Sequence, residues 1–263
     1  MARFKLTLEY AGTRYSGWQI QKNARTVAGE IDRAVRDATG VGDFELYGAG
    51  RTDAGVHALA QVAHLDIRTN LPPASLRQRV NDELPADINI LRVEPAPHRF
   101  HARHTAVSRT YLYQVATRRT AFGKPFVWWV REPLDVEAIR RAAVRFEGMR
   151  DFASFTDDDP DEKSTKVAVT RVRVDQAGDL LLLRVEGSHF LWKMVRRMVG
   201  VLVAIGRGEL TARELDQFMS KPSDAPARLT APASGLFLER VTYRGDPAIA
   251  DAAPLLRLPS FGQ

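Results

Sequence analysis

The chain has 263 residues, 44% of them hydrophobic, which is enough for one large domain or two medium domains with cores of their own. It contains no cysteine, which excludes a disulfide framework, a thiolate nucleophile and a zinc site built from thiolates. The formal net charge of +6 favours a polyanionic partner such as a nucleic acid.

The chain shows no targeting or membrane-spanning pattern. Met1–Lys5 alternates polar and apolar side chains and lacks the apolar segment of a signal peptide. No run approaches the ~20 apolar residues that a membrane span requires. We therefore expect a cytoplasmic protein.

Hydrophobic periodicity predicts alternating strands and helices along the first half. The expected elements are a strand at Arg3–Tyr10, a helix from Thr26 to Gly40, a strand at Gln61–Ile67, a helix over Leu71–Leu84 and a strand at Ile88–Val93. Thr26 is a suitable N-cap for the first helix, and Gly40 is a suitable end.

The second half repeats this order. Its expected elements are a strand at Thr110–Ala116, a helix over Asp135–Phe146, strands at Val167–Val174 and Leu180–Glu186, a helix over Phe190–Ala204 and a strand at Leu236–Tyr243. Asp175–Asp179 is expected to connect the two paired strands, and the acidic run Asp157–Glu162 to form a mobile loop. The repeated order predicts an α+β fold with an antiparallel or mixed sheet.

The segment Gly48–His57 has the composition of a functional loop. Its three glycines allow backbone conformations that are closed to other residues, and Arg51 and Asp53 lie between them. A guanidinium two residues from a carboxylate can hold that carboxylate ionised. The alternative is a glycine-rich turn with solvated charges.

Two further groups of residues have two interpretations each. Tyr15 and Trp18 either fold back onto the core or stack on nucleobases. The imidazoles of His98, His101 and His104 are spaced for a shared metal, but the absence of a carboxylate or thiol in that run favours a basic RNA-facing segment.

The predicted helix over Phe190–Ala204 places Arg196 at the margin of its apolar face, with Lys193 and Arg197 on the opposite face. Arg196 would then be partly desolvated and need an anion, unless its head group reaches solvent. Gly200, one turn later, leaves room beside it. Tyr111 is either ordinary strand packing or a ring available for stacking.

Several of these segments resemble, in order, blocks of the tRNA pseudouridine synthase A family. The blocks are Tyr15–Gln19, Gly48–Ala58, Phe100–Arg103 with Arg109–Tyr113, Phe190–Gly200 and Thr230–Leu236. The matching region extends from about Phe4 to Tyr243, and no family block matches beyond Arg244.

The resemblance implies isomerisation of uridine to pseudouridine at positions 38, 39 and 40 of the tRNA anticodon arm, without metal or cofactor. It implies Asp53 as the catalytic aspartate, Arg51 as a contact of the flipped-out nucleotide and Tyr111 as the ring that stacks on the uracil. It further implies Arg196 as the basic partner of the aspartate and Leu236 as an apolar residue of the uracil pocket. Whether the aspartate adds to the ring, attacks C1′ or abstracts a sugar proton stays open.

The resemblance also implies two similar α/β halves whose sheets join into one extended sheet, with helices on one side, a basic cleft between the halves and assembly as a homodimer. We expect an N-terminal domain over 1–104, a C-terminal domain over 105–245 and a peripheral tail over 246–263.

Two other functions compete with this one. A non-catalytic RNA-binding protein would share the basic charge and the aromatics, but Asp53 would be dispensable in it. A nucleotide-binding enzyme that cradles phosphate with the loop glycines is less consistent with the sequence, since no Lys-Ser/Thr pair follows Gly55.

Overall fold

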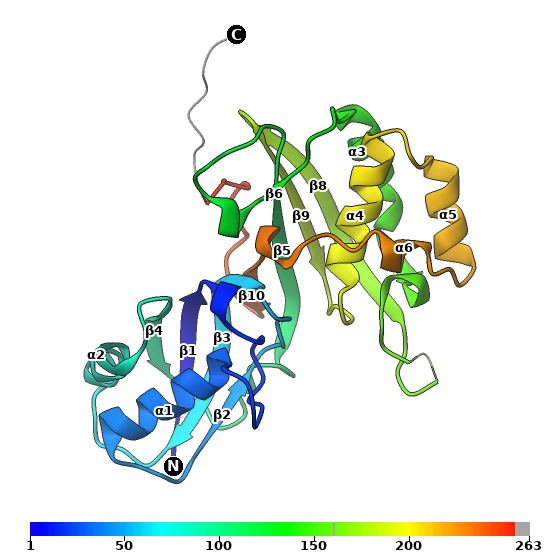
Figure 1. Ribbon diagram of the computed structural model, residues 1–263. Helices are drawn as coiled ribbons and strands as arrows, with labels where there is room; N and C mark the ends of the chain where they lie inside the picture. Colours follow the sequence, from blue (N-terminus) through cyan, green and yellow to red (C-terminus); the bar gives the residue numbers. More distant parts are fainter. Residues whose placement is uncertain (160, 256–263) are drawn as a thin grey trace. The chain divides into compact units, whose positions relative to one another are not determined.

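The computed structural model describes residues 1–159 and 161–255 of the chain, which form two compact units (Figure 1). Unit 1 comprises Met1–Val107 and Phe237–Asp246, and unit 2 comprises Ser108–Leu236 with the described residues 247–255. Each unit combines helices with strands that pair in both parallel and antiparallel fashion. The expected α+β class with a mixed sheet is therefore confirmed.

Strand β3 is the central strand of unit 1. It pairs antiparallel with β1 and with β2 and parallel with β10, while β4 pairs antiparallel with the far side of β1. The strands are β1 (Ala2–Tyr10), β2 (Phe44–Gly48), β3 (His57–Ile67), β4 (Ile88–Pro95) and β10 (Leu236–Tyr243). Strand β2 was not expected from the sequence.

Helices α1 (Val27–Thr39) and α2 (Pro73–Glu83) pack against each other in unit 1 (Figure 1). The Thr26 hydroxyl accepts a hydrogen bond from the Gly29 N–H at 3.2 Å, and Gly40 ends the helix in the left-handed conformation at φ 69°. Both predicted ends of α1 are confirmed. Val27, Ile31, Ala34 and Val35 of its apolar stripe are buried, so the helix is fixed by the core as well as by its caps.

Unit 2 has the strand order β5-β9-β8-β7, and β6 pairs parallel with β5. The strands are β5 (Ala106–Ala116), β6 (Trp128–Trp129), β7 (Gly148–Asp151), β8 (Lys166–Ala177) and β9 (Leu180–Gly187). The expected five-residue connection between β8 and β9 is wrong. Ala177 pairs with Leu180, which leaves a two-residue turn with Gly178 at φ 60°.

The helices of unit 2 are α3 (Val136–Ala143), α4 (Met194–Gly206), α5 (Ala212–Ser220) and α6 (Ala225–Arg228). Single 3₁₀ turns occur in both units at Gly12–Arg14, Lys124–Phe126, Val144–Phe146, Ala153–Phe155 and Ala233–Gly235. Helix α4 begins at Met194 and not at Phe190, because Lys193 takes a left-handed conformation at φ 61° and the chain before it is not helical.

Two aspartates of the acidic run hold the start of α4. The Asp157 carboxylate pairs with Lys193, at 2.7 Å, and with Arg197, and the Asp158 carboxylate accepts the Trp192 N–H at 3.0 Å. Negative groups at a helix N-terminus also complement its dipole. These contacts hold Asp157 and Asp158 in place, whereas the sequence had led us to expect a mobile loop.

The last described residues lie against the sheet of unit 2. The Arg184 guanidinium donates to the Ala250 carbonyl at 2.7 Å, and the Leu255 N–H donates to the Gln114 side chain at 2.8 Å. The expected tail is thus docked on unit 2 as far as residue 255, and the rest of it lies outside the described residues.

Candidate functional site

The loop that carries Asp53 connects two neighbouring antiparallel strands, β2 and β3. At its start the Ala49 N–H donates to the Val62 carbonyl at 2.7 Å, and near its end the Val56 N–H donates to the Asp53 carbonyl at 3.1 Å. The second bond closes a four-residue turn in which Gly55 has a φ of 78°, a conformation that favours glycine. Asp53 thus occupies the first position of a tight turn.

Buried polar side chains of β1 and β3 also hold this loop in place. The Thr52 hydroxyl hydrogen-bonds the Tyr10 hydroxyl at 2.8 Å, and the Gln61 side-chain amide donates to the Gly50 carbonyl at 3.1 Å. Burial raises the pKa of Tyr10 to about 12, so its phenol keeps its proton at neutral pH. Satisfied polar groups in a core fix geometry, and Gly50 and Thr52, which precede Asp53, are held in this way.

The segment after β1 packs on the loop through its backbone. The Trp18 N–H donates to the Thr52 carbonyl at 3.1 Å, and the Gly55 N–H donates to the Tyr15 carbonyl at 3.2 Å. A Cβ at Gly17 would lie 2.5 Å from the Thr52 carbonyl oxygen, so a glycine is required there. The rings of Tyr15 and Trp18 are buried, which decides in favour of the core interpretation and against base stacking.

Arg51 and Asp53 differ in their surroundings. The Asp53 side chain is half-buried, whereas that of Arg51 is exposed. Within the described part of the chain, the Arg51 guanidinium has no hydrogen bond or ion pair. The structure therefore gives no support to the prediction that Arg51 keeps the Asp53 carboxylate ionised. An exposed guanidinium is better suited to contact a phosphate than to pair with Asp53.

In unit 2, Tyr111 lies on β5 with its ring half-buried. The ring meets that of Phe190 edge to face, with 5.1 Å between the centroids and 86° between the planes. Tyr113, two residues along the same face of β5, is fully buried and donates its hydroxyl to the Pro232 carbonyl at 2.7 Å. Of the two tyrosines, Tyr113 therefore belongs to the core, whereas Tyr111 is only half-buried.

Arg196 is in the first turn of α4 and is half-buried, as its predicted place at the margin of the apolar face implies. Its Nε donates to the Ala231 carbonyl at 2.7 Å. The prediction that Arg197 lies on the polar face of this helix is wrong. Arg197 is only 4% exposed and donates to the Thr156 carbonyl at 2.6 Å. Its charge is compensated by Asp157, a partner that the helical pattern alone does not contain.

Leu236 is buried at the start of β10, directly after a 3₁₀ turn that ends at Gly235. A Cβ at Gly235 would lie 2.5 Å from the Tyr113 ring, so this turn packs closely on β5. Unit 2 thus brings Arg196, Tyr113 and the segment before Leu236 together. Asp53 and Arg51 belong to unit 1, and the assignment of all five predicted residues to one site stays a prediction.

The histidine-rich segment packs on the sheet of unit 1. The backbone N–H groups of Arg103 and His104 donate to His101 Nδ1 at 3.1 and 3.3 Å, and His64 Nδ1 accepts the Ala102 N–H at 3.2 Å. Over residues 1–159 and 161–255, no three His, Cys, Asp or Glu side chains lie close enough to hold a metal ion. Burial, with smaller contributions from Arg3 and His101, lowers the pKa of His64 to about 4.

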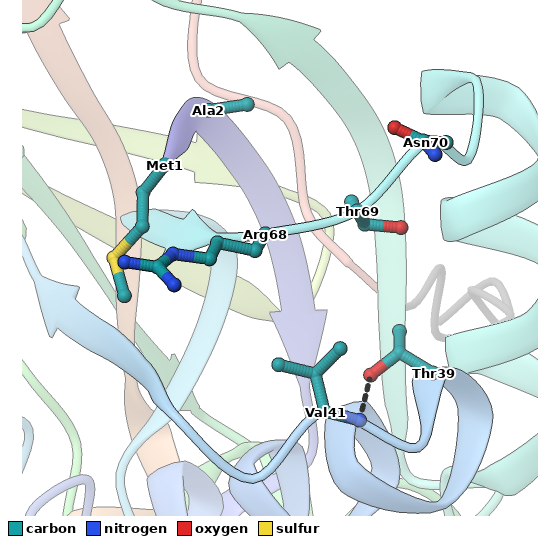
Figure 2. A pocket seen from close by; sticks show the side chains of 7 residues that line it. All are labelled: Met1, Ala2, Thr39, Val41, Arg68, Thr69 and Asn70. Atoms are coloured by element: carbon teal, nitrogen blue, oxygen red, sulfur yellow. Dashed lines mark hydrogen bonds between the residues drawn. The ribbon is translucent and has the colours of Figure 1, made fainter.

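Two hollows occur within single units. A cavity of about 530 Å³ in unit 1 is lined by Met1, Ala2, Thr39, Val41, Arg68, Thr69 and Asn70 (Figure 2). A smaller one of about 190 Å³ in unit 2 is lined by Arg171, Arg173, Arg184, Glu186, Ile249, Ala250 and Asp251. Neither is lined by any predicted site residue.

Among the described helices, none has the length and apolar character needed to cross a bilayer.

A family model described as tRNA pseudouridine synthase matches residues 7–104 and 142–244. The tRNA pseudouridine synthase A of Nitrobacter winogradskyi is 41% identical over 93% of this chain and 97% of that protein. That of Nitrobacter hamburgensis is 40% identical over 92% of this chain and 100% of that protein. The chain belongs to the tRNA pseudouridine synthase family.

Among solved structures, the chain resembles one from a Cbf5-Nop10-Gar1 complex, with a TM-score of 0.38 and 11% identity. The match covers 77% of this chain and 45% of that one, and it is too remote to add to the family assignment.

Proposed function

We propose that the chain isomerises uridine to pseudouridine at positions 38, 39 and 40 of the tRNA anticodon arm, with Asp53 as the catalytic carboxylate. The observation that carries the proposal is the 41% identity to a tRNA pseudouridine synthase A over nearly the whole length of both chains. The rigid turn around Asp53 supports it, since catalytic groups need a fixed position.

The reaction rearranges one nucleotide and adds nothing to it. The bond from C1′ to N1 breaks, the uracil rotates and C1′ joins C5, while the C5 proton is released and N1 gains a proton. Because the rearrangement involves no net oxidation or reduction, it needs no redox cofactor. Asp53 must be ionised to act as a nucleophile or base, which is its ordinary state at neutral pH.

The other predicted residues have separate roles in this proposal. Tyr111 stacks on the uracil after the base leaves the helix, and Leu236 lines the apolar side of the uracil pocket. Arg196 pairs with the Asp53 carboxylate and keeps it charged. Arg51 contacts the backbone of the extruded nucleotide, a role that its exposure supports.

The proposed partners are one tRNA and a second copy of the chain. The excess of Lys and Arg, 38 against 32 Asp and Glu, favours phosphate contacts. We propose a homodimer, as in other members of the family, and action in the cytoplasm, where tRNA is modified.

The test is tritium release from tRNA that carries 5-tritiated uridine. The unaltered protein should release tritium, and Asp53→Ala should release none while it binds tRNA with a Kd within about threefold of normal, because the carboxylate adds little phosphate affinity. Asp43→Ala, which removes an exposed carboxylate just before β2, is the matched control and should be fully active.

The same assay tests the competing function. An RNA-binding protein without catalysis would bind tRNA but release no tritium at any enzyme concentration. Undiminished release by Asp53→Ala would instead show that the protein is a synthase whose catalytic group lies elsewhere.

A further inference from the structure

Phe190 lies against the ring that is proposed to receive the uracil. It belongs to the non-helical segment between β9 and α4, and its ring is half-buried. The edge-to-face contact with Tyr111 is close to perpendicular, at 86°. Tyr111 therefore has an aromatic neighbour on one side that comes from a different part of the chain.

The backbone before Phe190 is shaped to hold this ring in place. A Cβ at Gly187 would lie 3.1 Å from Phe190 Cζ and 3.0 Å from the Ala168 carbonyl oxygen, which is closer than ordinary contact. The Ser188 N–H donates to that carbonyl at 2.9 Å, and the Ser188 carbonyl accepts from Arg109 at 2.9 Å. The segment that carries Phe190 is thus fixed to β8 and to β5.

A perpendicular contact restrains a ring without covering both of its faces. If the Phe190 edge points at Tyr111, one face of Tyr111 is covered, and if the Tyr111 edge points at Phe190, neither face is. In both cases at least one face of Tyr111 stays clear of Phe190 for a planar base. A ring that is already held in one orientation loses less conformational entropy when a base stacks on it.

We propose that Phe190 is a positioning residue that holds the Tyr111 ring in the orientation for stacking on the uracil, and that Gly187 provides the space for it. The proposal rests on the proposed function, and in particular on the stacking role of Tyr111. Phe190 acts through Tyr111 and need not touch the nucleotide.

A double-mutant cycle tests this, with kcat and KM for tritium release measured for Phe190→Leu, Tyr111→Leu and the double variant. Phe190→Leu should lower kcat by about tenfold and leave KM for tRNA within about twofold, because the ordering of the ring affects the flipped base and not the phosphate contacts. The double variant should be no slower than Tyr111→Leu alone.

Two further variants separate positioning from folding. Trp192→Leu alters an exposed ring of the same segment and should leave kcat unchanged. Gly187→Ala keeps the Phe190 ring but displaces it, so it should reproduce the loss of kcat. All variants are compared by thermal melting and by Kd for tRNA.

Other outcomes would overturn the proposal in distinguishable ways. If Tyr111→Leu is slow and Phe190→Leu is not, the positioning role is wrong and the proposed function stands. If the two losses multiply in the double variant, Phe190 acts independently of Tyr111. If Tyr111→Leu retains full activity, the stacking role of Tyr111 fails and the positioning role fails with it.

Discussion

Arg196 and Ala231 exchange two hydrogen bonds: Arg196 Nε donates to the Ala231 carbonyl at 2.7 Å, and the Ala231 N–H donates to the Arg196 carbonyl at 3.1 Å. The first turn of α4 is thereby joined to the segment that leads into β10. The orientation of the Arg196 side chain depends on how closely this segment approaches the helix. Gly200 determines that approach, because a Cβ there would lie only 1.7 Å from the Leu229 carbonyl oxygen.

We predict that Gly200→Ala destabilises the protein and removes activity. The new methyl must displace the backbone at Leu229, and overpacking of this kind costs roughly 1–3 kcal/mol of unfolding free energy or more. Urea unfolding and tritium release would measure the two effects. Gly42→Ala is the control, since its Cβ would meet only the end of the Arg36 side chain at 3.6 Å. Equal stability of the two variants would contradict the prediction.

The elements best predicted from the sequence are those with local signals. Helix α1 has a hydroxyl at its N-cap and a glycine at its end, and both were found where expected. The class of fold also followed from the order of strands and helices. By contrast, β2 was missed although Phe44 and Leu46 alternate with Glu45 and Tyr47, because five residues are too few to separate a strand from a loop.

The errors in α4 have a tertiary cause. Helical spacing from Phe190 onward continues the apolar pattern, but the left-handed Lys193 delays the helix, and nothing local requires that conformation. The same pattern placed Arg197 in solvent, although Asp157, forty residues earlier, makes its burial possible. The position of Arg196 at the margin was predictable, because it depends only on the apolar residues of its own helix.

The ion pairs at the start of α4 lead to a second prediction. Burial raises the pKa of Asp157, but Lys193 and Arg197 outweigh it and hold this pKa below its usual value. Asp157→Asn would leave the buried Arg197 without its carboxylate, so we expect a loss of roughly 1–3 kcal/mol in unfolding free energy. Because the folded pKa is lowered, this stabilisation is present at neutral pH and lost as the pH falls through the folded pKa.

Equilibrium unfolding of Asp157→Asn at pH 7 and at successively lower pH would measure both effects. The control is Asp161→Asn, an exposed carboxylate of the same run. The difference between the variants should shrink in acid. A difference that stays constant with pH would mean that the Asp157 charge is not what stabilises α4.

The third prediction concerns His64 and mild acid. Its pKa is lowered from 6.5 to about 4 in the folded chain, so the unfolded chain binds more protons between these values. The stability linked to His64 is therefore complete above pH 6.5 and decreases as the pH falls towards 4, by about 3 kcal/mol at most. His64→Asn keeps an acceptor for the Ala102 N–H but does not titrate.

The unfolding free energy of His64→Asn should accordingly vary less between pH 6.5 and 4 than that of the unaltered protein. His98→Asn changes an exposed imidazole and should leave the pH profile as it was. Parallel profiles for His64→Asn and the unaltered protein would exclude His64 as the source of acid sensitivity.

The last prediction separates two glycines of the Asp53 loop. A Cβ at Gly48 would lie 2.6 Å from the buried Trp18 ring, whereas a Cβ at Gly50 would meet no atom within 4 Å. Gly48→Ala should therefore lower the melting temperature, while Gly50→Ala should melt normally, because its φ is not positive. If the space at Gly50 receives the RNA backbone, Gly50→Ala will raise KM for tRNA severalfold with its stability intact. A normal KM would show that the nucleotide enters past another part of the loop, and the exposed Arg51 next to it would then be the first residue to test.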